Sequence, residues 1–130
     1  MQNLFSGARA RGLTAAIVMA AATVPALAHH GWSWTVEETS ELKGVIRDLY
    51  LGNPHATLDV DVNGEVWKVE LAPPRATERA GFTDASAKPG DEVTAIGHRS
   101  RDEADHRMKA VRIVVSGKTY DVYPDRVPTN

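Results

Sequence analysis

Apolar and polar residues alternate along several short stretches of this chain. The clearest stretch is 56–62, where every second residue is Ala, Leu or Val and the residues between them are Thr or Asp. Strict alternation of this kind indicates a strand with one buried face. Asn63-Gly64 follows, which is the strongest short hairpin signal, and residues 65–71 return with Trp67 on the apolar face. The pattern therefore predicts a β-hairpin over residues 56–71.

Three further strands are predicted over residues 42–51, 92–98 and 108–116. In the first of them, Gly44 is expected to form a bulge or a sharp bend. The prolines at 73 and 74 end the hairpin and favour a helix start, so residues 75–80 are predicted as a short helix with Gly81 as its C-terminal cap. Residues 119–123 form a short terminal extension.

Three strands, a short helix and two more strands are the element order of a five-stranded OB-like barrel. We therefore predict an all-β fold with one short helix between strands three and four. A bend at Gly44 would let the long first strand serve both sheets, and closure of the barrel would remove exposed strand edges. The alternative is an open meander with the helix on one face.

The first 28 residues are interpreted as a cleavable export signal. Arg9 and Arg11 precede an apolar run over 13–24, and Ala26-Leu27-Ala28 has the small residues of a cleavage site. The run is shorter than the roughly 20 apolar residues that a membrane span needs. No cysteine follows it for lipid attachment. These features predict a secreted bacterial protein of the periplasm without a membrane span.

The predicted organisation is a signal peptide over 1–28, an N-terminal arm over 29–38, the barrel domain over 39–123 and a C-terminal tail over 124–130. Loss of Arg9 and Arg11 with the signal would change the formal net charge from −2 to −4. An acidic domain of mixed charge lacks the basic surface typical of nucleic-acid binding. The chain has no cysteine, so neither a disulfide nor a thiolate metal ligand is available.

Cleavage after Ala28 would leave a chain that begins His29-His30-Gly31-Trp32. The free α-amine and the ring of His29, with one imidazole from elsewhere, would form a T-shaped three-nitrogen site. This histidine-brace arrangement suits Cu(II), which prefers tetragonal nitrogen ligands. His55, in Asn53-Pro54-His55, is the favoured third donor, and His98 at the end of a predicted strand is a weaker candidate. Alternatively, the amine, the amide nitrogen of His30 and the His30 ring would chelate copper or nickel in one plane.

The same residues also have structural explanations. A histidine pair after a signal peptide can be a plain polar start, and His55 beside proline can serve loop hydrogen bonding. His98 and His106 fit structural or surface roles. Trp32 and Trp34 would face one side of an extended arm, where they would either cover an end of the barrel or form a stacking platform for a sugar or an aromatic ligand.

No nucleophile motif, phosphate-binding glycine loop or paired-histidine zinc helix is present in the sequence, so an enzyme is not predicted. The predicted function is a small exported binding protein that holds a transition metal, copper, through its N-terminal histidines. The alternative is a non-metal binding or structural module of the periplasm for a protein partner or a small ligand.

Several short patterns occur together along the mature chain: His-His-Gly-Trp at 29–32, Gly-Asn-Pro-His at 52–55, Trp-Lys-Val-Glu at 67–70, Arg-Ala-Gly at 79–81 and Lys-Pro-Gly-Asp-Glu-Val at 88–93. As a set they resemble a family of small exported bacterial proteins known as a domain of unknown function. The resemblance implies a secreted OB-like barrel in which His29, His30 and His55 match recurrent positions, and it implies no activity. Ala87 departs from the pattern, which has leucine there.

Overall fold

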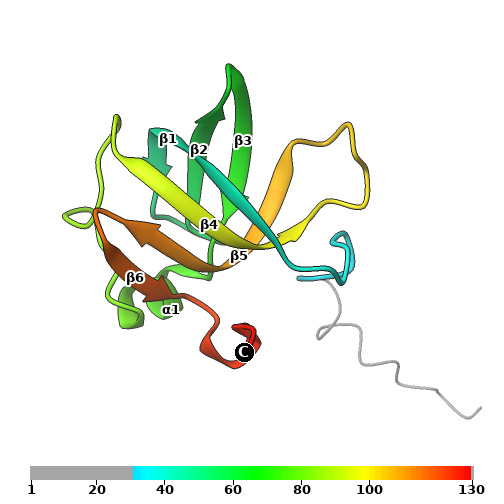
Figure 1. The fold of residues 1–130 in the computed structure, drawn as a ribbon. Coiled ribbons are helices and arrows are strands. Elements are labelled where there is room, and N and C mark those ends of the chain that lie inside the picture. The colour runs from blue at the N-terminus through cyan, green and yellow to red at the C-terminus, as the bar shows by residue number, and fades with distance from the viewer. Residues whose placement is uncertain (1–30, 130) are drawn as a thin grey trace, which may run out of the picture.

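The structure is a computed structural model that describes residues 31–129. The described elements, in chain order, are β1 (Ser40–Tyr50), β2 (Thr57–Val62), β3 (Glu65–Glu70), α1 (Pro74–Arg79), β4 (Glu92–Arg99), β5 (Arg107–Val115), β6 (Lys118–Asp121) and the 3-10 turn η1 (Pro124–Arg126). Each of the five predicted strands and the predicted helix is present, with bounds within two residues of those predicted. Figure 1 shows this arrangement.

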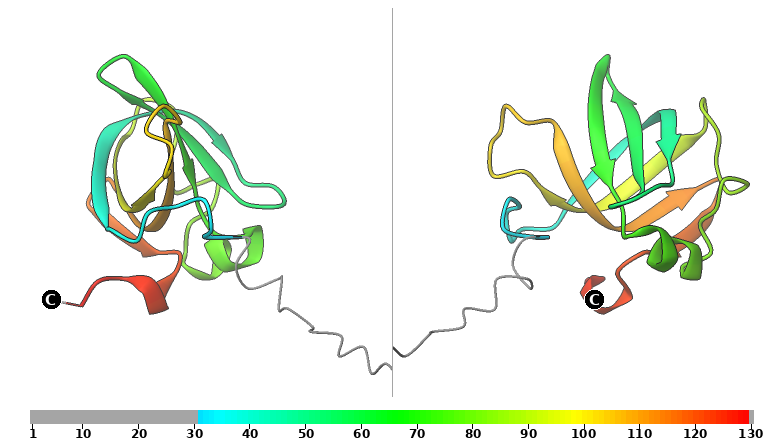
Figure 2. Two further views of the ribbon diagram at one scale, coloured as in Figure 1. Left: turned by 90° about the vertical axis from the view of Figure 1, so that its right-hand side faces the viewer. Right: turned by 180° about the vertical axis from the view of Figure 1, so that it is seen from behind.

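The strands form one sheet in the order β3-β2-β1-β4-β5-β6. The sheet closes on itself because β3 also pairs with β5 in parallel, at Lys68 to Glu70 against Arg107 to Lys109. Strands β1 to β5 thus form a closed barrel, visible from two sides in Figure 2. The prediction of a five-stranded OB-like barrel, with a helix between strands three and four, is confirmed.

Strand β6 is an addition to the barrel. It pairs with β5 from Lys118 to Asp121, where the sequence pattern predicted a terminal extension. After it, the chain leads through η1 to the C-terminal end, which Figure 1 places below β5 and β6.

Gly44 lies in the part of β1 where its pairing changes from β4 to β2. Leu42 pairs with Ala95 of β4, whereas Leu49 pairs with Leu58 of β2. A Cβ atom at Gly44 would overlap the carbonyl oxygen of Asp61, so only glycine allows this close approach. The bulge itself lies slightly later, between Ile46 and Asp48.

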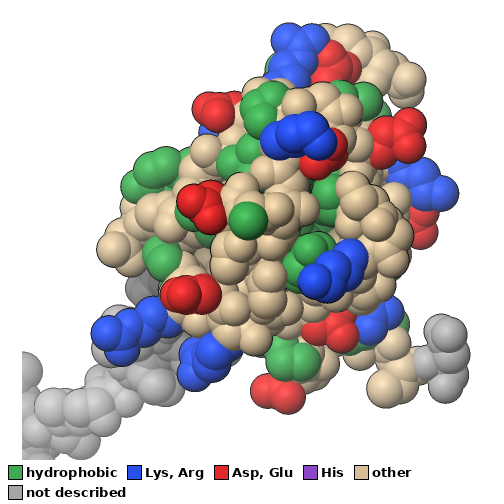
Figure 3. All heavy atoms as spheres, turned by 90° about the vertical axis from the view of Figure 1, so that its left-hand side faces the viewer, with side chains coloured by type: hydrophobic (Ala, Val, Ile, Leu, Met, Phe, Trp, Pro, Cys, Tyr) green, Lys and Arg blue, Asp and Glu red, His purple; other side chains and the backbone are tan. Residues whose placement is uncertain are grey.

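The interior of the barrel is apolar and follows the predicted alternation. Leu58, Val60 and Val69 are fully buried. Phe82, which follows the short helix, also belongs to this core and meets the ring of Tyr120 on β6 edge to face at 5.2 Å. None of the helices described between residues 31 and 129 is long and apolar enough to cross a lipid bilayer. On the face in Figure 3, acidic and basic side chains are interspersed.

Candidate functional site

The outer face of β5 is covered near its start, although outward side chains of a small barrel usually meet solvent. Met108 and Ala110 point into the core, and Lys109 between them points out of the barrel. Lys109 is nevertheless only 1% exposed. The N-terminal arm and the segment that follows β6 cover it, since its ammonium contacts both.

Strand register places Lys109 in the middle of a polar row. Glu70 on β3 pairs with Lys109 across the parallel ladder, and His98 on β4 pairs with Lys109 from the other side. Three residues far apart in sequence therefore lie side by side on the outside of the barrel, at the seam where β3 meets β5.

The Lys109 ammonium has both polar and aromatic partners. Its Nζ donates to the Gly31 carbonyl oxygen at 2.7 Å and to Oε1 of Glu70 at 3.0 Å. The same Nζ lies 4.8 Å from the ring centre of Trp32 and 5.6 Å from that of Tyr123. These contacts compensate the loss of water around a buried charge, which would otherwise be costly.

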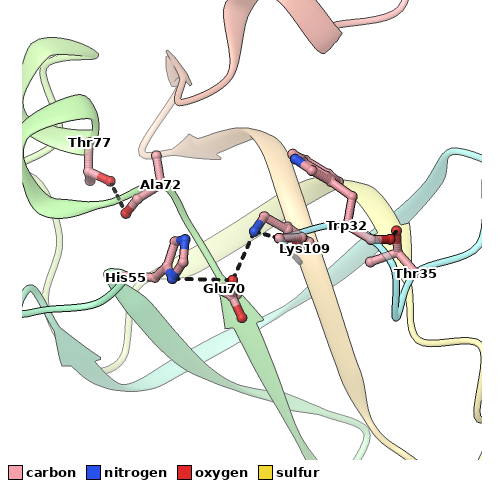
Figure 4. Close-up of polar contacts among 8 residues, drawn as sticks. Trp32, Thr35, His55, Glu70, Ala72, Thr77 and Lys109 are labelled. Carbon is pink, nitrogen blue, oxygen red and sulfur yellow. Dashed lines mark hydrogen bonds and ion pairs between the residues drawn. The ribbon is translucent and has the colours of Figure 1, made fainter. Parts of the chain in front are cut away.

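His55 is the next member of this arrangement, shown in Figure 4. Its Nδ1 faces Oε1 of Glu70 at 3.6 Å, which is longer than a hydrogen bond and still within the range of an electrostatic contact. The residue after His55 holds it there: the Ala56 carbonyl accepts from the Leu71 amide at 2.8 Å, and the Ala56 amide donates to the Ala72 carbonyl at 3.1 Å, beside the end of β3.

The pKa of His55 is lowered from its ordinary value. Burial is the main cause, the nearby Lys109 ammonium adds to it, and the Glu70 carboxylate opposes it. His55 is therefore a neutral imidazole at neutral pH. Its Nδ1 is turned to Glu70, so its Nε2 is the nitrogen left for another partner.

Tyr123 forms the wall of the site that comes from the C-terminal segment. Burial, helped by the Glu70 carboxylate, raises the pKa of its phenol to about 12, although the Arg126 guanidinium opposes this shift. Its ring meets that of Trp32 edge to face, with centres 5.0 Å apart. We call His55, Glu70, His98, Lys109, Trp32 and Tyr123 the seam cluster.

The arm that covers the seam cluster is not extended where the tryptophans lie. Residues 31–34 form a turn, in which the Thr35 hydroxyl donates to the Trp32 carbonyl at 2.8 Å. The expectation that Trp32 and Trp34 share one side of an extended segment is wrong for this reason. Trp32 packs on the seam, whereas Trp34 carries the Arg107 guanidinium 3.9 Å from its ring centre.

The predicted metal donors do not all lie in the described part of the chain, and those that do are found on opposite sides of Lys109. His29 and His30 lie outside the described residues. His55 belongs to the seam cluster, and His98 lies on the opposite side of Lys109, edge-on to Trp32 at 5.6 Å. Within residues 31–129, no group of three or more His, Asp or Glu side chains is arranged to hold a metal ion. His106 stacks on Trp67 at 4.9 Å, away from this row.

Sequence reasoning missed the two residues that organise the site, Lys109 and Glu70. In the sequence, Glu70 stands out only as the last residue of the Trp-Lys-Val-Glu pattern, and Lys109 is one polar position in a predicted strand. A weak signal existed, because both residues occupy outward positions next to strand ends. Their pairing depends on the parallel β3–β5 contact, which local patterns do not encode.

Comparison with solved structures supports the fold. A chain from the crystal structure of the S. pombe Stn1–Ten1 complex is similar with a TM-score of 0.50 and 17% sequence identity. The similarity covers 62% of this chain and 59% of that one, so less than two thirds of the other chain's length is matched. At this identity the likeness concerns the fold alone.

Comparison with curated proteins gives no match. Residues 16–109, in contrast, match the family of unknown function DUF6152. This match includes most of the barrel, Gly31 and five of the six residues of the seam cluster, all but Tyr123. The chain belongs to the DUF6152 family.

Proposed function

We propose that this protein is an exported, periplasmic metal-binding protein that holds Cu(II) at the seam cluster. The donors would be the α-amine and ring of His29 together with the imidazole of His55, and His30 would be a second N-terminal donor. The role would be copper buffering or delivery.

The observation that carries the proposal is the docking of the arm beside His55. The Gly31 carbonyl binds Lys109 at 2.7 Å, Lys109 binds Glu70 at 3.0 Å, and Glu70 faces His55 at 3.6 Å. His29 and His30 are joined to Gly31 by one or two peptide units, and consecutive Cα atoms are about 3.8 Å apart. These contacts link Gly31, the first described residue of the arm, to His55 through Lys109 and Glu70, and this linkage supports a brace that combines His55 with the residues before Gly31.

The chemistry of His55 fits a metal ligand. A metal-binding histidine commonly directs its second ring nitrogen to a carboxylate, which fixes the ring orientation and raises the basicity of the ligating nitrogen. Glu70 is placed to do this at Nδ1. The lowered pKa keeps the ring neutral, and neutral imidazole is the form that binds metal.

Lys109 introduces a positive charge near the proposed site. Glu70 offsets it through their direct contact, so the pair adds little net charge beside the donors. Bound copper would supply a redox-active or Lewis-acid centre. The residues of this chain would hold the arm, orient His55 and shield the site from water.

The test is a Cu(II) titration of the exported protein, followed by electron paramagnetic resonance. Mass spectrometry first establishes that the chain starts at His29. We expect one Cu(II) per chain with a three-nitrogen signal. His55→Ala should remove one nitrogen and weaken binding by more than tenfold, and an extra alanine before His29 should do the same.

His106→Ala is the matched control, because this imidazole lies on Trp67 away from the seam cluster. It should leave the copper signal unchanged. Binding that is indifferent to His55 would mean that only the N-terminal peptide chelates copper. Affinity no greater than that of a free His-His-Gly peptide would overturn the proposal.

A further inference from the structure

A polar hollow lies on the His98 side of Trp32, next to the seam cluster. It has a volume of about 400 Å³, and its walls include Trp32, Val36, Glu37, His98, Arg101 and Arg126. This volume is within the usual range for small-molecule sites. His55, the proposed copper donor that lies within the described residues, is not among its lining residues.

The frame of this hollow is held by hydrogen bonds between two distant segments. The backbone of Val36 donates to Arg99 at 2.9 Å, and that of Arg101 donates to Trp34 at 2.9 Å. Thr35 also forms a bridge with Ser100, and both residues are buried. The hollow is therefore formed by ordered main chain before any ligand arrives, which lowers the entropic cost of binding.

Two guanidinium groups line the hollow. Arg101 donates through Nε to the Thr35 carbonyl at 2.8 Å, which fixes its position and leaves its two terminal nitrogens. Arg126 lies 4.2 Å from the ring centre of Trp32, so the indole face holds it in place. Neither arginine has an ion pair with any carboxylate in the described part of the chain, whereas Arg47, Arg107 and Arg112 each have one.

The remaining walls of the hollow indicate which other groups an anionic ligand would carry. Trp32 and Val36 offer apolar surface, and Glu37, the one carboxylate among the described lining residues, can accept a hydrogen bond. Guanidinium groups bind carboxylate and phosphate oxygens in pairs of parallel hydrogen bonds. The combination of charge and apolar surface suits an organic molecule better than a bare inorganic ion.

We propose that the hollow between the arm, His98 and η1 binds a small organic anion, whose carboxylate or phosphate group is held by Arg101 and Arg126. The ligand's apolar body would lie against Trp32 and Val36. This site does not depend on copper, and its test is carried out with a chelator present.

The experiment follows the Trp32 indole and arginine Nε signals by NMR while three probes are added to the exported protein. Benzoate is the organic anion, benzamide is its neutral isostere, and inorganic phosphate is the anion without an apolar body. We expect saturable shifts with benzoate, weaker shifts with phosphate and none with benzamide.

Arg126→Gln tests the position of the site, because this side chain is exposed on the terminal turn and its loss should not unfold the barrel. The benzoate affinity should fall about tenfold, as expected for one charge-assisted contact. Arg79→Gln on α1 is the control, since Arg79 is remote from the hollow, and it should leave the affinity unchanged. Thermal unfolding checks that both variants remain folded.

Three results would overturn the inference. Equal binding of benzamide and benzoate would mean that charge plays no part. The absence of saturable shifts with benzoate would mean that no site exists for organic anions. Equal effects of Arg126→Gln and Arg79→Gln would place the anion elsewhere on the surface.

Discussion

The interior of the barrel and the outer seam between β3 and β5 are both shielded from water, but apolar side chains form the interior, whereas charged and aromatic side chains form the seam. Inside, Leu58, Val60 and Val69 are fully buried and need no specific partner. At the seam, Lys109 is 1% exposed and is satisfied by the Gly31 carbonyl, Glu70 and two aromatic rings. The first region is stabilised by transfer of apolar surface from water, and the second requires that each contact be formed.

This difference indicates where function is to be sought. An apolar interior tolerates exchange of one hydrophobic residue for another of similar volume, because its attraction is not directional. A buried lysine held by a carbonyl and a carboxylate has no such freedom, because removing one partner leaves the other buried and unpaired. Replacing both partners of a buried ion pair with apolar residues, in contrast, is often neutral or stabilising, so such a pair is not needed for stability itself. A charged cluster kept under an arm therefore suggests a role beyond stability, and it is the place where His55 lies.

The largest expected effect belongs to the interior. Leu58→Ala would leave a cavity at a fully buried position, which should lower the free energy of unfolding by about 3 kcal/mol. Chemical denaturation of the metal-free protein measures this change. Val66→Ala, at a half-exposed position on β3, is the control and should cost less than about 1 kcal/mol. A small cost at Leu58 would mean that the barrel can collapse around the cavity.

The next effect separates the seam from the interior. Lys109→Met keeps a long unbranched side chain but leaves Glu70 and the Gly31 carbonyl without their partner, which should lower the free energy of unfolding by about 2 kcal/mol. Glu70→Gln should cost a similar amount. The double variant should cost clearly less than the two single changes together, because no buried charge remains unpaired.

Lys68→Met is the matched control for this cycle, since Lys68 pairs with Asp59 on the exposed face of the neighbouring strands. It should change stability by less than about 1 kcal/mol. The hydrogen-exchange rate of the Val36 amide, which donates to the Arg99 carbonyl, gives a second measurement of how firmly the arm is held. Exchange should accelerate in Lys109→Met if the ammonium docks the arm, and additive effects at Lys109 and Glu70 would contradict the pairing.

The smallest effect is a pH dependence. The pKa of His55 is lower in the folded protein than its ordinary value, mainly because the ring is partly buried. Between these two values the unfolded chain binds more protons than the folded one, so stability should decrease as the pH falls from about 6.5 through the folded pKa. Comparing His55→Asn with the parent chain by denaturation at several pH values isolates this contribution. A parent curve parallel to that of the variant would show that burial of His55 has no effect on its titration.

Much of the barrel could be predicted because its signals are local. The alternation over 56–62, the Asn63-Gly64 turn and the prolines before α1 each act within a few residues of one another. The conformation of the arm was harder to predict, because the turn over residues 31–34 depends on partners far away in the sequence. Trp32 packs there against His98 of β4 and against Tyr123, which follows β6. The sequence does predict the loop that contains His55, since Asn53-Pro54 interrupts the strands there, and the structure has residue 55 in the loop before β2. Its neighbours Glu70 and Lys109 could not be identified from spacing.

The sequence by itself determined where the strands and the helix lie along the chain. It also determined which side chains face the interior, since a strand places alternate residues on opposite faces. Tertiary structure alone decided which outward residues would be buried. Lys109 meets Gly31 and Glu70 across 78 and 39 positions of the chain, through barrel closure and the docking of the arm. These contacts depend on strand register and on what covers the outer face, so the seam cluster exists only once the barrel has closed.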